Sequence, residues 1–180
     1  MLGIKNIILG VTASVAIYKS CDLLRCLKEE KFLVSVVMTK ESQELIKPKL
    51  FESLSLNKVY CGLFDESSSW EIEHVSLADK ADLILIAPAT ANIIGKIAGG
   101  ICDDLLTCIV MASKAPVLIC PAMNDVMYKN VITQTNIAKL KKCGYKFLAP
   151  VEGKLACGKM GIGCFVSIEE IVKEVKKEVL

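Results

Sequence analysis

Four short segments of this chain are predominantly apolar and show no regular alternation of apolar and polar residues. They are Lys5–Gly10, Phe32–Met38, Leu83–Ala87 and Pro116–Cys120. Strands of this composition are buried on both faces, which is typical of parallel sheets covered by helices. Because helical patterns lie between these strands, we expect an α/β fold: a Rossmann-like three-layer sandwich with helices on both faces of a parallel sheet.

The segments between the strands carry helical patterns. Apolar residues recur at helical spacing over Val15–Lys31. A helix over Glu41–Lys47 is expected to end at Pro48, and Lys146–Leu148 is a candidate fifth strand. The stretch 150–164 has four glycines and no periodicity, so we expect a long loop there. The remaining helices are expected over Asn92–Ala98, Asp104–Ser113, Val131–Lys142 and Ser167–Val179.

Length and charge limit the class of protein. The 180 residues fit one domain spanning 1–180, and 53% hydrophobic residues are enough for a core. The longest runs without charge, 6–18 and 83–95, have only 13 residues, and a membrane-spanning helix needs about 20. Net charge is +2 and no block of Lys or Arg occurs, so we expect neither a nucleic-acid nor a membrane partner. We expect a cytoplasmic protein.

The nine cysteines do not form a disulfide or metal pattern. Their number is odd, no pair has the C-x-x-C spacing, and the chain has a single histidine. A long chain with an ample core does not depend on disulfides, so a reducing compartment is expected. No metal site is expected.

Loops that follow the strands are rich in small, hydroxyl and amide side chains. They are Gly10–Ser14, Thr39–Ser42, Pro88–Asn92 and Pro121–Asp125. Ligands of parallel sheets bind at the carboxyl ends of the strands, where backbone N–H groups and helix N-termini hold phosphate. A phosphorylated ligand is therefore expected. The first turn has neither G-x-G-x-x-G nor the P-loop pattern, which disfavours a nicotinamide dinucleotide or ATP.

Three residues carry side chains suited to chemistry. His74 is a candidate acid or base, although a lone histidine is more often a packing or surface residue. Asn124 follows a buried strand, where it can cap the next helix or hold a carboxylate through its neutral amide. Cys157 lies in the glycine-rich stretch, where an exposed thiol is not needed for packing and the loop can hinge over a site.

Taken together, the motifs resemble the flavin-containing cysteine decarboxylases, and the match runs from about residue 5 to 166. The ordered set is more specific than any one motif. It comprises G-V-T-A-S-V-A-I-Y-K (10–19), E-H-V-S-L-A-D-K-A-D (73–82), A-P-A-T-A-N (87–92), I-A-G-G-I-C-D-D-L-L-T (97–107), P-A-M-N-D-V-M-Y (121–128) and L-A-C-G-K-M-G-I-G (155–163).

The resemblance implies FMN as cofactor and an activity. A cysteine-derived acid is oxidised to a thioaldehyde, loses CO₂, and is reduced from an ene-thiol. The motifs are most similar to members that convert 4′-phosphopantothenoylcysteine into 4′-phosphopantetheine in coenzyme A biosynthesis. Such members are carboxy-lyases and assemble as homotrimers or multiples of trimers such as dodecamers. Since the chain ends at Leu180, the ligase that makes the substrate is expected on another polypeptide.

Site residues carry over from the resemblance by position. His74 and Cys157 match the catalytic residues, and stretch 150–164 matches the substrate clamp. The substrate-binding positions are Asn124, Lys154, Ala122 and Met123. The FMN-binding positions are Ala13, Ser14, Val15, Thr39, Ser42, Thr90, Ala91, Asn92, Ile93 and Ala122.

Three positions depart from the family pattern. Tyr128 replaces a tryptophan, Thr90 replaces a serine, and Cys164 stands where many bacterial members have arginine. The first two changes keep the aromatic ring and the hydroxyl. The third removes a positive charge beside the clamp.

Other functions are weighed against this reading. A peptidyl-cysteine decarboxylase would use the same oxidative residues but would not need the Cys157 motif. A non-catalytic FMN-binding regulatory subunit would be indicated by loss of His74 or Cys157, and both are present. A flavin prenyltransferase or a flavodoxin-like electron carrier would have no role for this set of residues.

Overall fold

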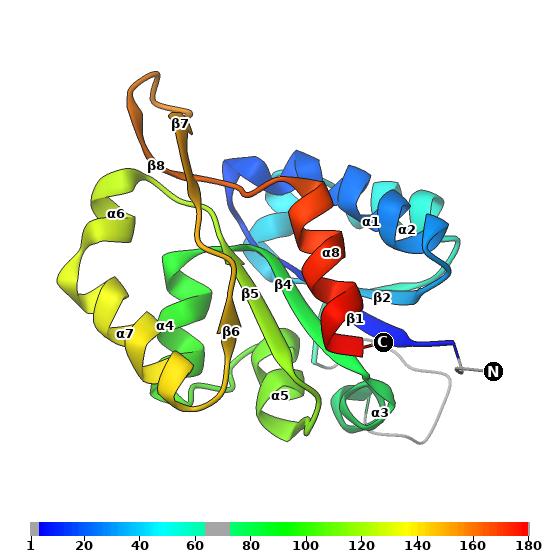
Figure 1. Ribbon diagram of the computed structural model, residues 1–180. Helices are drawn as coiled ribbons and strands as arrows, with labels where there is room; N and C mark the ends of the chain where they lie inside the picture. Colours follow the sequence, from blue (N-terminus) through cyan, green and yellow to red (C-terminus); the bar gives the residue numbers. More distant parts are fainter. Residues whose placement is uncertain (1–3, 64–72, 180) are drawn as a thin grey trace.

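A sheet of six strands in the order β3-β2-β1-β4-β5-β6 forms the centre of the molecule (Figure 1). The computed structural model describes residues 4–63 and 73–179. All neighbouring strands in this sheet are parallel. The strands are β1 (Asn6–Val11), β2 (Leu33–Met38), β3 (Val59–Tyr60), β4 (Leu83–Ala89), β5 (Val117–Pro121) and β6 (Lys146–Phe147).

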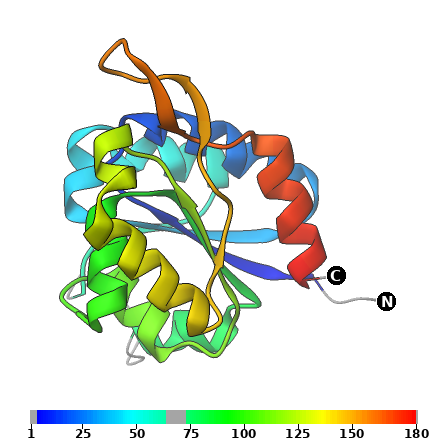
Figure 2. The same cartoon turned by 60° about the vertical axis from the view of Figure 1, so that its left-hand side comes forward.

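Helices cover both faces of this sheet, as Figures 1 and 2 show. Helices α1 (Lys19–Glu29), α2 (Pro48–Ser55) and α8 (Ile168–Val179) pack on one face. Helices α3 (Glu73–Lys80), α4 (Ala91–Gly99), α5 (Leu105–Ala112) and α7 (Val131–Lys142) pack on the other. Short helical segments complete the chain: η1 (Val15–Tyr18), η2 (Lys40–Glu44) and α6 (Asp125–Lys129). Among the described residues, no helix has the length and apolarity needed to cross a membrane.

The burial of the strands confirms the parallel, doubly covered sheet predicted from the apolar runs. All seven residues of β4 are buried, and so are all five of β5. Their side chains alternate between the two cores, because successive residues of a strand point to opposite faces. Leu83 and Leu85 join the core beside α1 and α8, whereas Ile84 and Ile86 join the core beside α4 and α5.

The predicted helix ending at Pro48 is wrong. Before Pro48 the structure has the short 3₁₀ segment η2 in place of the predicted helix, and Pro48 is the first residue of α2. Proline is favoured at the first helical position because its missing N–H has no intrahelical acceptor there and its φ is already helical. The burial of Phe51, which has no exposed surface, anchors α2 against the sheet.

The stretch 150–164 is a β-hairpin and not the irregular loop that was predicted. Strands β7 (Val151–Lys154) and β8 (Met160–Cys164) are antiparallel, and Gly153 pairs with Gly161. The hairpin projects beyond the carboxyl ends of the central strands (Figure 1). Most of its residues are exposed, so no apolar alternation marks it in the sequence.

Asp82 joins the beginnings of the two central strands. Its carboxylate accepts hydrogen bonds from the backbone N–H of Asn6 at 2.8 Å and from Nζ of Lys5 at 3.2 Å. The N–H of Asn6 is the main reason that the pKa of Asp82 is lowered, and Lys5 lowers it further. The ionised carboxylate therefore stabilises the pairing of β1 with β4.

We predict that Asp82→Asn lowers the free energy of unfolding by about 0.5–1.5 kcal/mol at pH 7, the scale of one charge-assisted contact at a partly exposed site. A folded-state pKa below the unfolded value of about 3.9 means that the stabilisation is present above about pH 4. It is lost as the pH falls through the folded-state pKa. Urea unfolding at a fixed protein concentration measures the difference between variant and wild type at each pH.

Asp79→Asn serves as the control, because Asp79 is an exposed residue of α3 without a described partner. The difference between Asp82→Asn and wild type should shrink toward zero in acid. An equal difference at pH 7 and about pH 2 would show that the charge of Asp82 does not contribute.

Candidate functional site

A cavity of about 660 Å³ opens where the loops at the carboxyl ends of β1, β4 and β5 meet the β7–β8 hairpin. Its walls come from segments that lie far apart in the sequence. The lining residues are Ala13, Ser14, Val15, Ala16, Tyr18, Lys19, Thr90, Ala91, Ala122, Met123, Asn124, Met127, Lys154, Leu155, Ala156, Cys157, Gly158, Gly163, Cys164 and Phe165.

Hydroxyl groups hold the three loops together. Oγ1 of Thr12, which is buried, donates to the carbonyl of Pro88 at 2.7 Å and accepts from the N–H of Thr90 at 3.1 Å. Oγ of Ser14 donates to the carbonyl of Ala122 at 2.9 Å. The hydroxyls of Thr12 and Ser14 therefore connect the loops that form the cavity.

Helix α4 begins at the wall of this cavity. Thr90 is its N-cap, and Oγ1 of Thr90 accepts from the N–H of Ile93 at 3.3 Å. The other N–H groups of the first turn have no intrahelical acceptors and carry the positive end of the helix dipole. Ala91 adds only a methyl group, so the backbone at this helix end stays accessible from the cavity.

Asn124 caps α6 and presents its amide group to Cys157. Oδ1 of Asn124 accepts from the N–H of Val126 at 2.9 Å, which leaves Nδ2 free to donate. Nδ2 lies 3.9 Å from Sγ of Cys157 at the tip of the hairpin. The cap thus sets the orientation of the amide. Asn124 can therefore cap α6 and still offer its amide N–H to a carboxylate, the two roles considered from the sequence.

Gly163 allows the hairpin to approach the loop after β5. Its carbonyl accepts from the N–H of Met123 at 3.1 Å. A Cβ at Gly163 would lie 2.1 Å from the carbonyl oxygen of Met123, and φ is +153°. Only glycine fits there, because both the backbone conformation and the contact exclude a side chain.

Most of the predicted site residues meet at this cavity. The residues that do are Ala13, Ser14, Val15, Thr90, Ala91, Ala122, Met123, Asn124, Lys154 and Cys157. Five predicted residues do not line it: His74, Thr39, Ser42, Asn92 and Ile93. A single copy of the chain therefore does not bring these five side chains to the cavity.

His74 lies in the first turn of α3, the helix that precedes β4. It is partly buried, and it is not among the residues that line the cavity. Asn124 and Cys157 therefore meet without His74 in a single copy of the chain.

The four other predicted residues that do not line the cavity are buried or lie at a second cavity. Thr39 and Ser42 follow β2 and are buried, and Oγ of Ser42 donates to the carbonyl of Thr39 at 2.7 Å. Ile93 is buried against the core of α4. Asn92 lines a second cavity of about 480 Å³, which shares Ala91 and Met127 with the first.

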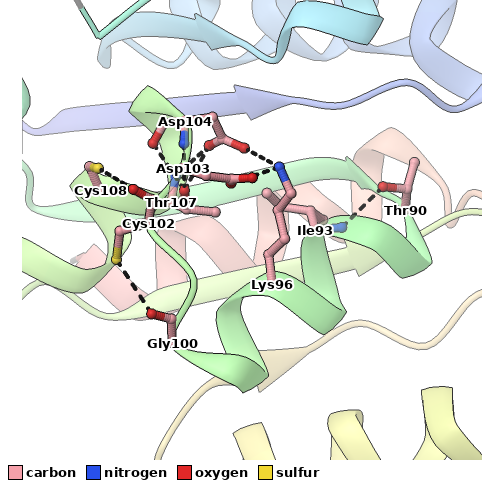
Figure 3. A network of polar contacts seen from close by, with 9 residues as sticks. All are labelled: Thr90, Ile93, Lys96, Gly100, Cys102, Asp103, Asp104, Thr107 and Cys108. Carbon is pink, nitrogen blue, oxygen red and sulfur yellow. Dashed lines mark hydrogen bonds and ion pairs between the residues drawn. The ribbon is translucent and has the colours of Figure 1, made fainter.

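A charged network fixes the connection between α4 and α5 beside the second cavity (Figure 3). Nζ of Lys96 lies 2.8 Å from Oδ1 of Asp103 and 3.0 Å from Oδ2 of Asp104. Asp104 also caps α5 through a reciprocal pair of hydrogen bonds with Thr107. The hydrogen bond from Lys96 lowers the pKa of Asp103, so this aspartate stays ionised. The network explains the D-D-L-L-T motif as a structural feature.

Within residues 4–63 and 73–179, two lysines but no carboxylate line the first cavity. Lys154 was predicted from the sequence, whereas Lys19 and Tyr18 were not. The sequence feature that could have identified Lys19 and Tyr18 is their position, because both follow the first turn and lie at the start of the first helix. The cavity is therefore electropositive and suits an anionic ligand.

Exposure separates Cys157 from the structural cysteines. Cys157 is exposed at the cavity, whereas Cys120 in β5 is fully buried. Burial raises the pKa of Cys120 strongly, so it stays a neutral thiol. Cys102 and Cys143 are exposed as well, and Cys157 differs from them in lining the cavity.

Comparison with known proteins was made for sequence and for structure. The Flavoprotein family model matches residues 1–180. The "Coenzyme A biosynthesis bifunctional protein CoaBC" of Bacillus subtilis (strain 168) is 44% identical over 98% of this chain. The "Probable phosphopantothenoylcysteine decarboxylase" of Streptococcus mutans is 39% identical over 97% of this chain and 98% of that protein. This chain spans 44% of the length of the bifunctional Bacillus protein.

Two solved structures match almost the whole chain. A cysteine-to-serine mutant of PPC decarboxylase complexed with pantothenoylaminoethenethiol has a TM-score of 0.86 and 34% identity, covering 97% of this chain and 98% of that one. The FMN binding protein AtHal3 has a TM-score of 0.81 and 35% identity, covering 96% of this chain and 95% of that one. These matches agree with the fold predicted from the apolar strands.

We predict that Gly163→Ala separates the hairpin from the loop after β5, because the added methyl group overlaps the Met123 carbonyl. The expected result is faster hydrogen exchange of the Met123 N–H and a loss of about 1–3 kcal/mol of stability, typical of overpacking. Gly144→Ala is the control, since Gly144 also has a positive φ of +91° but nothing within 4 Å of its Cβ position. Unchanged exchange at Met123 in Gly163→Ala would contradict the role given to this contact.

Proposed function

Because this chain belongs to the Flavoprotein family, we propose that it is an FMN-dependent carboxy-lyase that converts 4′-phosphopantothenoylcysteine into 4′-phosphopantetheine in coenzyme A biosynthesis. The observation that carries the proposal is the meeting of the Asn124 amide and the Cys157 thiol in a cavity that no carboxylate of the described residues lines. The Streptococcus relative of equal length and the PPC decarboxylase structure, which hold the same fold, support the choice of substrate.

The residues at the cavity suit a flavin. Small side chains at Ala13, Ala91 and Ala122 leave a wall on which a planar ring can lie. N–H groups at the start of α4 would be available as donors to the cofactor, and Ser14 and Val15 extend this wall. We assign Thr39, Ser42, Thr90, Asn92 and Ile93 to the same cofactor site. Bound FMN would supply a reversible hydride acceptor for the carbon that bears the substrate thiol.

Asn124 would bind the substrate carboxylate. Its Nδ2 is held toward the cavity by the cap on α6, so the donor is oriented before the substrate arrives. A neutral amide positions the carboxylate without a positive charge, which would stabilise the carboxylate against loss of CO₂. Met123 and Ala122 precede Asn124 in the same loop and complete this wall.

Cys157 would supply the proton that completes the product. Oxidation of the substrate's CH₂–SH to a thioaldehyde lets the carboxylate leave as CO₂, and the remaining ene-thiol needs a hydride and a proton to become a saturated thiol. Cys157 is exposed at the cavity, next to Asn124, so its S–H can reach a carbon held there. The hairpin around it, with Lys154, would cover the substrate and exclude water.

His74 would reach the site from a second copy of the chain. It does not line the cavity in one copy, yet it is the residue that would act as a base on the thiol. Exposed apolar side chains on α6 and α7, at Val126, Val131 and Ile132, offer a surface for self-association. We propose a homotrimer or a multiple of trimers, in which one copy provides His74 and another provides Cys157.

The proposal also includes the enzyme that supplies the substrate and the compartment in which the reaction takes place. A phosphopantothenate–cysteine ligase activity would supply the substrate, and the Bacillus relative is named as a bifunctional protein of coenzyme A biosynthesis. We place the reaction in the cytoplasm.

The function itself is tested by adding FMN and 4′-phosphopantothenoylcysteine to the purified protein and following CO₂ release and product mass. A cysteine-ending peptide serves as the competing substrate, and preference for the peptide would favour the peptidyl-cysteine decarboxylase.

We predict that Cys157→Ser releases CO₂ but stops at the ene-thiol, because a serine hydroxyl is a much weaker proton donor than a thiol. Mass spectrometry should find a product two hydrogens lighter than 4′-phosphopantetheine. Cys143→Ser is the matched control, since Cys143 is also exposed but ends α7. Full conversion to the saturated product by Cys157→Ser would remove Cys157 from the mechanism.

We predict that co-expression of His74→Asn and Cys157→Ser chains restores part of the full turnover that each variant lacks. A mixed assembly contains sites with an intact His74 from one copy and an intact Cys157 from another. Formation of saturated product is measured for the co-expressed and the separately purified variants. If mixed assemblies form but show no gain, both residues act within one copy.

A further inference from the structure

Lys19 is a partly buried cation without a partner. It is the first residue of α1 and lines the cavity from the side of the first turn. Within the described part of the chain, its Nζ has no hydrogen bond and no ion pair. No part of the proposed mechanism uses this side chain.

Every other partly buried lysine in the described residues has an acceptor. Lys5 pairs with Asp82, and Lys176 pairs with Glu30. Lys96 pairs with Asp103 and Asp104. Lys28 donates to the carbonyls of Leu54 and Ser55, at 3.0 Å from that of Leu54. Lys19 is thus the exception to a pattern that the rest of the chain follows.

This exception points to an anionic ligand. Removing an ammonium group from water costs free energy unless an acceptor replaces the lost hydration. Among the described residues, no Asp or Glu that could serve as that acceptor lines the cavity. An anion bound in the cavity would provide it.

The proposed substrate has two anionic groups, and only one of them suits Lys19. A positive charge beside the carboxylate would oppose the loss of CO₂, and Asn124 already offers a neutral donor for that group. A phosphate monoester carries a charge of about −1.5 to −2 at pH 7 and stays unchanged through the reaction. It can therefore be bound by a cation without slowing the chemical step.

We propose that Lys19 is a specificity-determining residue that binds the 4′-phosphate of the substrate. The inference rests on the proposed function, because it assigns the second end of the same substrate. Lys19 comes from α1 and Asn124 from the loop after β5, so the two ends of the substrate would be held by different elements. Lys19 and Lys154 are the cationic residues that line this cavity within the part of the chain that the structure describes.

The test compares two substrates, 4′-phosphopantothenoylcysteine and pantothenoylcysteine, in three variants. Lys19→Met removes the charge, Lys19→Arg keeps it, and Lys114→Met is the matched control. Lys114 is exposed before β5, at the opposite end of the sheet from the cavity. We expect Lys19→Met to lower kcat/KM for the phosphorylated substrate by about 10–100-fold, mainly through KM, the scale of a lost charge-assisted hydrogen bond. The preference for the phosphorylated substrate should fall by the same factor, and Lys19→Arg should retain most of it.

Binding provides a second measurement that does not depend on turnover. Calorimetry should find that wild type binds 4′-phosphopantetheine more tightly than pantetheine, and that Lys19→Met removes the difference. Equal losses for both substrates, or an unchanged preference, would overturn the proposal. A weakened FMN affinity measured by flavin fluorescence, with the substrate preference intact, would place Lys19 at the cofactor phosphate and also overturn it. Absence of decarboxylation by wild type would reject the proposed function, while the binding comparison would still decide the role of Lys19.

Discussion

The hydrogen bonds of Thr12 and Ser14 connect the three loops that form the cavity. Their hydroxyls bind the carbonyls of Pro88 and Ala122, which belong to loops following two other strands. Parallel strands bring their carboxyl ends to one edge of the sheet, but the loops beyond that edge have no ladder to hold them. Two short side chains on the first turn therefore supply the order that the sheet cannot.

Backbone hydrogen bonds connect the loops at this edge of the sheet to the hairpin. The N–H of Ala122 donates to the carbonyl of Ala89 at 3.0 Å, and the N–H of Met123 donates to the carbonyl of Gly163 at 3.1 Å. Asn124 follows at once and uses its side chain to start α6. The amide that faces Cys157 is thus at the end of a continuous series of hydrogen bonds that begins in the central strands. A rigid donor of this kind loses little entropy when it binds a ligand.

The sequence predicts those parts of the molecule whose burial produces a pattern. β4 is buried at all seven residues and was found from its apolar run. Pro48 was misread because proline both begins and ends helices, and only the packing of Phe51 distinguishes the two cases. The hairpin has no apolar pattern because most of its residues face solvent, and its pairing depends on Gly153 and Gly161.

Among the site residues, too, sequence motifs identify some members, whereas the role of others can be recognised only in the structure. Asn124 and Cys157 were found because motifs mark them, but no pattern in the sequence shows that the amide is oriented by a cap or that His74 lies outside the cavity. Lys19 was quoted within a motif and given no role, since a lysine at the start of a helix is ordinarily a solvent-exposed residue. Its meaning depends on a comparison of partners among all partly buried lysines, which requires the three-dimensional structure.

The distribution of charge in the cavity follows from the reaction proposed for it. A carboxylate that must leave as CO₂ is best held by a neutral donor, whereas a spectator phosphate is best held by a cation. Asn124 and Lys19 satisfy these two demands from separate elements, and the described part of the lining contains no Asp or Glu that would repel either group. A carboxylate in that lining would pair with Lys19 and compete with the phosphate for it. The unpaired state of Lys19 is therefore what leaves the cavity able to bind a dianion.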